Sequence, residues 1–262
     1  MKKRLTRFLP FLLAFTIALP SYSVFAEEEN QAKEPQTNET NETQADETTA
    51  DDTLSLAAET AVLIDAASGE ILYDKDADKK MYPASITKLM TILLALENGK
   101  LTDEITFSHD AVYNIEPGSA HIAILEGETL TLEQVLRAII LRSANEASNG
   151  VAEYVDGSVE AFAKHMTERA KELGCTNTNF VNANGLFDEN HYTTAHDMAL
   201  IARELLKHEE YRSMMSETDY EIPPTNLQTE TRYLHGQHQM LNPNSIYYYK
   251  DALGGKTGYT VE

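Results

Sequence analysis

Residues 82–99 of this chain read YPASITKLMTILLALENG, and this stretch decides how the folded part is organised. Pro83 presets the backbone for a helix start, and Gly99 is a typical helix stop. Between them the apolar residues recur at spacings of three and four positions, which is the period of a helix with a broad buried face. The pattern predicts a helix that begins near Ala84 and ends at Gly99.

Two residues whose side chains could take part in catalysis lie in the first turn of this helix. Ser85 and Lys88 are three positions apart, so their side chains share one face. A serine hydroxyl is a poor nucleophile until a base takes its proton, and an amine is a base only when it is uncharged. Burial, the positive end of the helix and a second cation such as Lys256 would each favour the uncharged amine. The pair predicts a nucleophile with its base, although an ordinary helix-start serine is the alternative for Ser85 alone.

Two further short motifs, at residues 143–145 and 256–258, carry side chains that could transfer a proton or bind a substrate. Ser143 can pass a proton between amines, and Asn145 offers a donor and an acceptor that suit a peptide amide. Lys256 and Thr257 offer a positive charge and a hydroxyl for a carboxylate, and Gly258 allows a ligand backbone to approach closely. Taken singly, each motif also fits a polar helix end or a solvated strand end. In combination with the first motif they indicate a substrate site.

The remaining pattern predicts strands first, helices in the middle and a strand last, which is an α+β order. The region 218–253 is rich in Pro and Tyr and is expected to be irregular. Strands are expected at 61–64 and 70–73 and from about Leu253 through Lys256-Thr257-Gly258, and further helices from Thr131 to Leu141 and over 158–173 and 194–207.

The residues ahead of the folded part divide into two segments. Residues 1–26 have a basic start, a short apolar run and small residues before Ala26, which predicts a secretory signal peptide. The apolar run is too short, and too interrupted by proline, for a transmembrane helix. Residues 27–55 are acidic with almost nothing apolar, so they are expected to form a disordered linker. Residues 56–262 would then form one exported, extracytoplasmic domain, which the family resemblance described below places in the cell envelope.

Composition excludes several kinds of partner and site. The net charge is −21 and no basic patch is visible, which argues against nucleic acid and against adsorption to anionic lipid. The single cysteine, Cys175, excludes an intramolecular disulfide and is expected to be a half-buried structural thiol. His191, His196, His235 and His238 have no third ligand at a matching spacing, so no metal and no other cofactor is expected.

The three motifs, in this order, resemble the set shared by penicillin-binding proteins and class A β-lactamases. The longer stretches 82–91, 126–131, 179–182 with 185–186, and 191–195 resemble the serine-type D-alanyl-D-alanine carboxypeptidases, the low-molecular-mass penicillin-binding proteins. The likeness runs from about Ala57 to the last residue. It implies a β-lactamase/transpeptidase-like fold in which an antiparallel sheet packs with a helical cluster.

The resemblance also implies roles for individual residues. The substrate would be the peptidoglycan stem pentapeptide, from which terminal D-alanine leaves before water resolves the acyl-enzyme. Penicillin and other β-lactam antibiotics would acylate the same serine as substrate mimics. The implied catalytic residues are Ser85 as nucleophile, Lys88 as base and Ser143, and the implied substrate-binding residues are Asn145, Lys256, Thr257, Gly258 and Tyr259. The N–H groups of Ser85 and Tyr259 would form the oxyanion hole.

The sequence departs from the family pattern in three places. Ala144 stands where glycine is common, and Gly254-Gly255 precedes Lys256 where one glycine and an aliphatic residue are usual. The largest departure is the end at Glu262, because the family continues with two strands, a closing helix, a second β-rich domain and an amphipathic membrane anchor. We therefore expect a C-terminally truncated fold, a Lys256 strand without ladder partners, and membrane anchoring only through a segment absent here.

Three other interpretations compete with the peptidase. A class A β-lactamase would need a Glu-x-x-Leu-Asn motif, which is absent between Ser143 and Lys256. A non-catalytic wall-binding homologue conflicts with the presence of all three motifs. An inactive fragment of a longer protein agrees with the early end of the chain.

Overall fold

A helix at the centre of the folded part carries the first motif. The computed structural model describes residues 55–260, in which a 3-10 turn, η1 (Ala84–Thr87), runs directly into α1 (Lys88–Asn98). Gly99 follows the last helical residue. The predicted helix from Ala84 to Gly99 is therefore confirmed, with a 3-10 rather than an α-helical first turn. Most of the α1 side chains are buried, as its apolar pattern predicted. The predicted signal peptide and nearly all of the predicted linker lie outside the described residues.

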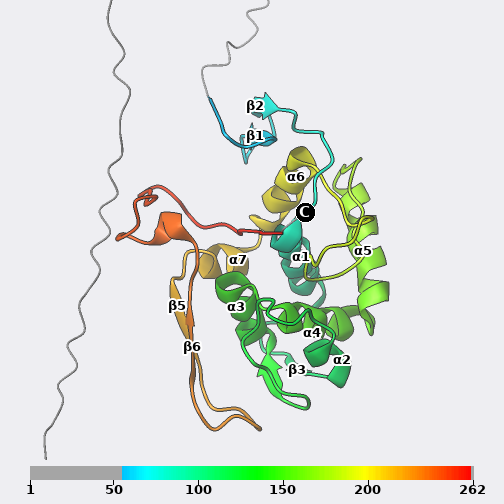
Figure 1. Cartoon of the computed structure of the whole chain (residues 1–262), viewed down its shortest axis with the longest axis vertical. Coiled ribbons are helices and arrows are strands. Elements are labelled where there is room, and N and C mark those ends of the chain that lie inside the picture. Colours follow the sequence, from blue (N-terminus) through cyan, green and yellow to red (C-terminus); the bar gives the residue numbers. More distant parts are fainter. Residues whose placement is uncertain (1–54, 261–262) are drawn as a thin grey trace, which may run out of the picture. The chain divides into compact units, whose positions relative to one another are not determined.

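The other helices surround α1 (Figure 1). They are α2 (His109–Tyr113), α3 (Leu132–Arg142), α4 (Asn145–Asp156), α5 (Val159–Glu172), α6 (Ala195–Leu205) and α7 (Glu209–Met214). Of these, α3, α4, α5 and α6 pack against α1. The predicted helices after Thr131, Ser158 and Thr194 are confirmed, and each of these three residues caps its helix through its side-chain oxygen.

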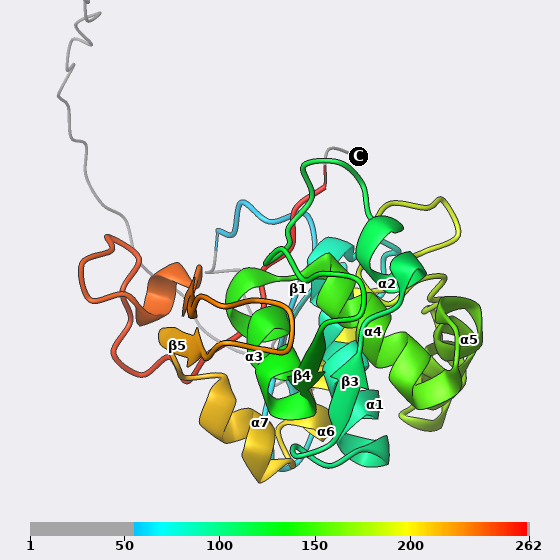
Figure 2. The same cartoon turned by 90° about the horizontal axis from the view of Figure 1, so that it is seen from below.

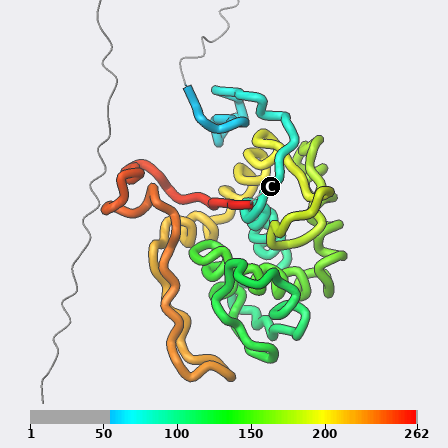
Figure 3. The backbone as a smooth tube through the Cα atoms, in the orientation of Figure 1, coloured from blue at the N-terminus to red at the C-terminus, as the bar shows by residue number. Residues whose placement is uncertain are grey.

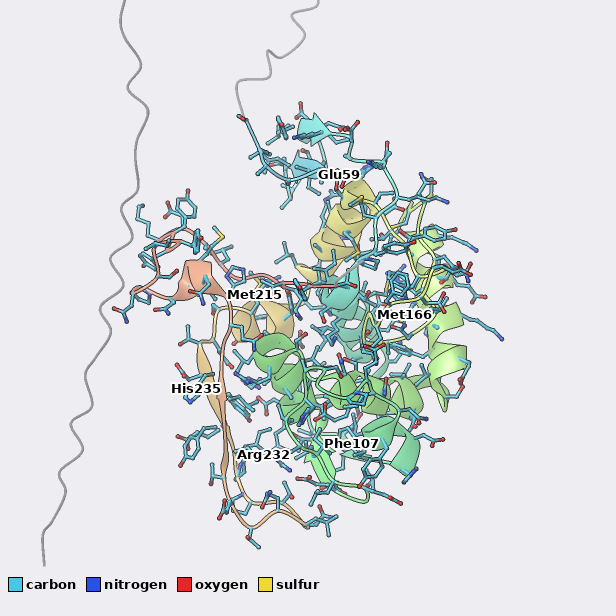
Figure 4. The ribbon with its side chains drawn as sticks, in the orientation of Figure 1. Glu59, Phe107, Met166, Met215, Arg232 and His235 are labelled. Atoms are coloured by element: carbon cyan, nitrogen blue, oxygen red, sulfur yellow. The ribbon has the colours of Figure 1, made fainter. Side chains whose placement is uncertain are left out.

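The helix α4 was not predicted, because its sequence mixes Asn, Ser, Gly and Glu, which do not form a clear apolar stripe. Its glycine has a packing role: a Cβ on Gly150 would lie 2.3 Å from Cε1 of Phe107. Phe107 and Met166, both labelled in Figure 4, are buried in the core. The small residues of α4 therefore allow large neighbours to pack against it.

Within residues 55–260 there are also three separate two-stranded antiparallel sheets. They pair β1 (Ala61–Ile64) with β2 (Ile71–Lys75), β3 (Glu104–Thr106) with β4 (Thr129–Thr131), and β5 (Asp219–Ile222) with β6 (Arg232–His235). The first hairpin is confirmed. The third lies in the region expected to be irregular, so that expectation was wrong there. It forms because Ile222 and Leu234 are buried, and it lies beside α3 (Figure 2).

A buried ion pair ties this third hairpin to the loop before β4. The Glu128 side chain is fully buried and accepts hydrogen bonds from Arg232 Nη1 at 2.6 Å and Nη2 at 2.7 Å. It also accepts from Thr225 Oγ1 at 2.7 Å and from the amide of Leu125 at 2.9 Å. Arg232 projects from the hairpin toward the helical cluster (Figure 4). The carboxylate is fully satisfied, as a buried charge must be.

The segment with the third motif differs from its prediction. Residues 251–260 contain no strand, and no ladder hydrogen bond joins 253–260 to another part of the described chain. A strand needs a neighbour that accepts and donates along its length, so the segment remains extended without becoming β-structure. It nevertheless runs to the N-terminal end of α1, as the red part of the tube shows (Figure 3). The third motif thus lies beside the first motif.

Candidate active site

The three predicted motifs meet at one cleft of about 650 Å³. Its walls come from segments far apart in the chain: Ser85, residues 116–120, Ser143 and Asn145, residues 184–187, Gln237, and residues 257–260. Ser85 lies on the 3-10 turn ahead of α1, where Ala84 has φ +47°. This left-handed backbone is uncommon for a residue with a side chain and turns the chain sharply just before Ser85.

The amine of Lys88 is fully buried and makes three polar contacts. Lys88 Nζ lies 3.1 Å from Ser85 Oγ and donates to Asn145 Oδ1 at 2.7 Å and to the backbone oxygen of Asn184. A neutral amine has two N–H donors and one lone pair. The two carbonyl oxygens take the two donors, which leaves the lone pair directed at the Ser85 hydroxyl. This geometry suits proton removal from Ser85.

The surroundings of Lys88 favour that neutral form. Burial lowers the pKa of Lys88 well below its usual value, and the positive charge of Lys256 lowers it further. The Glu146 carboxylate acts in the opposite direction. Burial and the second cation are the causes that the sequence predicted. The lone pair on Lys88 is therefore available at a pH where an exposed lysine would be fully protonated.

Ser143 and Asn145 are placed by the break between two helices. Ser143 is the C-cap of α3 with φ +57°, and Asn145 is the first residue of α4. The amide of Asn145 donates to Ala120 O at 2.8 Å. The left-handed cap reverses the chain so that both side chains of the Ser-x-Asn motif face the cleft.

Lys256 lies at the site although the segment that contains it is not a β-strand. Its Nζ donates to Ser143 Oγ at 3.0 Å and to Thr257 O at 2.7 Å. Burial lowers the pKa of Lys256 to about 8. The expectation that Lys256 would lack support without ladder partners is thus corrected, because its own side chain is held by Ser143 across the cleft.

The residues after Lys256 lie against the nucleophile turn. A Cβ on Gly258 would lie 3.0 Å from Pro83 O and 3.2 Å from Ser85 N, so this glycine allows two backbones to approach closely. The side chain of Tyr259 is 85% exposed. Tyr259 is also one of the residues that line the cleft.

Two other residues that the sequence singled out have structural positions. His191 is buried, contacts Thr87 Oγ1 through Nε2 at 2.7 Å, and has its pKa lowered by burial to about 4. Cys175 is buried rather than half-buried, and burial raises its pKa to about 12. Between residues 55 and 260 no three His, Cys, Asp or Glu side chains group as metal ligands would.

Two residues of the site were not found from the sequence. Asn184 holds Lys88 through its backbone oxygen, and Glu146 affects Lys88 through its charge. The Asn184-Gly185 dipeptide is a recognised turn signal, but nothing local says that the turn meets α1. Glu146 reads as an ordinary acidic residue in a first helical turn.

Replacing Gly185 with alanine is expected to destabilise the fold and to displace Ser85. Gly185 has φ +84°, and a Cβ there would lie 1.9 Å from Ala84 O. The clash and the unfavourable backbone together cost about 3–5 kcal/mol. Urea unfolding of the variant measures this cost. Gly157→Ala is the matched control, because Gly157 has φ +77° with no atom within 4 Å of its Cβ position. That control should lose only about 1–2 kcal/mol, and an equal loss in the two variants would contradict the prediction.

Comparison with known proteins identifies the family of this chain. Residues 44–262 match the sequence profile of the D-alanyl-D-alanine carboxypeptidase family. The D-alanyl-D-alanine carboxypeptidase DacF of Bacillus subtilis (strain 168) is 39% identical over 215 residues, which cover 80% of this chain and 52% of that protein. The chain thus spans about half the length of this curated relative.

Solved structures show the same fold. A D-alanyl-D-alanine carboxypeptidase from Mycobacterium tuberculosis H37Rv has a TM-score of 0.70 at 26% identity, over 78% of this chain and 74% of that one. The Streptomyces K15 DD-transpeptidase has a TM-score of 0.71 at 24% identity, over 80% and 82% of the two chains. The fold is therefore α+β and β-lactamase/transpeptidase-like. None of the helices within residues 55–260 has the length and apolar character to cross a membrane.

Proposed function

This chain belongs to the D-alanyl-D-alanine carboxypeptidase family, and from that premise we propose that it removes terminal D-alanine from peptidoglycan stem pentapeptides through an acyl-enzyme on Ser85. The observation that carries the proposal is the contact of Ser85 Oγ with Lys88 Nζ at 3.1 Å, with both N–H donors of a neutral Lys88 taken up elsewhere. Such a pair is an activated nucleophile with its base already aligned.

Acylation follows from the positions of these groups. Lys88 takes the Ser85 proton while Ser85 Oγ attacks the carbonyl carbon of the last peptide bond. The backbone N–H groups of Ser85 and Tyr259 stabilise the resulting oxyanion. Ser143, which Lys256 contacts at 3.0 Å, gives its hydroxyl proton to the leaving nitrogen and takes up in its place the proton that Lys88 removed from Ser85. The C–N bond breaks, D-alanine departs and Lys88 is neutral again. Water then hydrolyses the serine ester and restores the hydroxyl.

Substrate recognition uses the groups that remain. The free carboxylate of the last D-alanine fits the positive charge of Lys256 and the hydroxyl of Thr257, while Asn145 bonds the peptide amide. Gly258 leaves room for the peptide beside its backbone. A β-lactam presents a carboxylate and a reactive amide in a similar arrangement, so it acylates Ser85 as well. The enzyme acts outside the cytoplasm, where the predicted signal peptide would deliver it and where peptidoglycan is found.

The direct test is cleavage of the last peptide bond of a peptide that ends in D-Ala-D-Ala, which releases D-alanine, compared with the same peptide carrying a C-terminal amide, which releases D-alaninamide. We expect release from the acid and at least tenfold less from the amide, because the amide lacks the charge that Lys256 binds. Fluorescent penicillin should label the protein and leave it slowly. Rapid turnover of penicillin would favour a β-lactamase, and no labelling with no release would favour a non-catalytic homologue.

A further inference from the structure

One wall of the cleft is thin and unsupported. Residues 116–118 line the cleft on one side and a second cavity of about 290 Å³ on the other. Side chains of this wall therefore cannot rest on a packed core over that stretch. Its position depends on the bonds that hold the chain directly after it, at residues 119–124.

The start of α4 provides those bonds. The amide of Asn145 donates to Ala120 O at 2.8 Å, and the Glu146 carboxylate accepts from the amide of Ile122 at 2.7 Å. Glu146 is 1% exposed and also lines the second cavity. The buried Glu146 carboxylate thus holds the segment that follows the wall. Its neighbour Asn145 contacts Ala120 in that segment and Lys88 in the active site.

We propose that Glu146 is a positioning residue. It holds residues 116–122, which are the 116–118 wall and the segment directly after it, against Asn145, and thereby sets the shape of the cleft for the acyl donor. The assignment rests on the proposed function of the same cleft. Glu146 touches neither Ser85 nor the substrate position, so it acts through Ile122 and Asn145. A displacement of about 1 Å in such a wall is enough to slow a reaction by roughly 100-fold.

The charge of Glu146 also affects the pH dependence of the reaction, which gives a second way to test its role. Two titratable groups interact with Glu146: Lys88 from α1 and His121 from the segment after the wall. Lys256 acts on Lys88 and not on Glu146. Burial raises the pKa of Glu146, and the amides of Ile122 and its neighbours partly offset that rise. Because the Glu146 charge raises the pKa of Lys88, a neutral replacement moves the pKa of Lys88 further down.

The test compares Glu146→Gln with Glu128→Gln in the full-length protein. Both remove the charge of a buried carboxylate that accepts from an amide of the same loop, at Ile122 and at Leu125. Glu146 lines the second cavity behind the wall, whereas Glu128 lines neither that cavity nor the cleft. The readouts are the second-order rate of acylation by fluorescent penicillin, its pH profile, and the unfolding temperature. We expect Glu146→Gln to lower the rate about tenfold or more and to move the acidic limb to lower pH. Glu128→Gln should lower the unfolding temperature and leave the acylation rate within twofold.

A third variant separates position from charge and serves if Glu146→Gln fails to fold. Glu146→Asp keeps the charge but is one methylene too short to reach Ile122, so we expect a slower rate with the acidic limb unmoved. Acylation at the wild-type rate in Glu146→Gln, or a loss that merely follows stability in both the 146 and 128 variants, would overturn the assignment. Failure of D-alanine release in the wild type would instead refute the proposed function, because acylation rates are measured separately.

Discussion

Ser85→Ala is expected to abolish covalent labelling by penicillin and to reduce D-alanine release by roughly 10⁴-fold or more, the scale of losing a nucleophile. The fold should survive, because the Ser85 side chain is only half-buried and its hydroxyl has Lys88 as its hydrogen-bond partner. Lys88 keeps two carbonyl acceptors in the variant. The measurement is intact mass of the protein after incubation with penicillin, followed by peptide mapping of the adduct.

Ser216→Ala is a suitable control for this experiment. Ser216 is exposed and bonds only Ser213 O, at 3.2 Å, so its loss should leave labelling unchanged. An adduct that persists in Ser85→Ala, or that maps to another residue in the wild type, would remove Ser85 from the mechanism.

Lys88→Met is expected to lower the rate of acylation at least about 1,000-fold while the protein remains folded. Methionine fills nearly the same volume and no longer pays the desolvation cost of a buried amine. Against this, Asn145 Oδ1 and Asn184 O lose their donor, which costs about 1–3 kcal/mol for each buried acceptor left unpaired. Stopped-flow fluorescence with a fluorescent penicillin measures the rate, and urea unfolding measures the stability.

The pH profile of the wild type checks the same assignment. As pH falls, Lys88 gains a proton, loses its lone pair and can no longer accept from Ser85, so acylation declines on the acidic side. Because the pKa of Lys88 lies well below its usual value, this decline occurs well below pH 10. As pH rises past about 8, Lys256 loses the charge that binds the carboxylate, and KM should rise. An acidic limb that persists in Lys88→Met at measurable rates would contradict the role of Lys88.

Parts of the fold and of the site were predictable because they depend on local geometry. The helix after Pro83, the capping box at Thr131 and the helix caps at Ser158 and Thr194 follow from residue type and short spacing. The hairpin β5–β6 was not predictable, because Ile222 and Leu234 become its buried residues only when they meet the helical cluster.

The strand expected at Lys256 failed for a related reason. Its extended character is local, but a strand exists only when a neighbouring backbone completes its hydrogen bonds. The contact that does hold Lys256 joins it to Ser143, 113 positions earlier in the chain. No pattern in either segment indicates that contact.

By itself, the sequence determined which chemical groups are available and in what order, and it placed Ser85 beside Lys88, because residues three apart in a helical turn share a face. The packing of the domain set the remaining contacts: Lys88 is buried with Asn145 and Asn184 as acceptors, Lys256 meets Ser143, and the Glu146 carboxylate accepts from the amide of Ile122. The physical reason is that backbone geometry sets distances over a few residues, whereas burial and long-range hydrogen bonds arise from the packing of the whole domain.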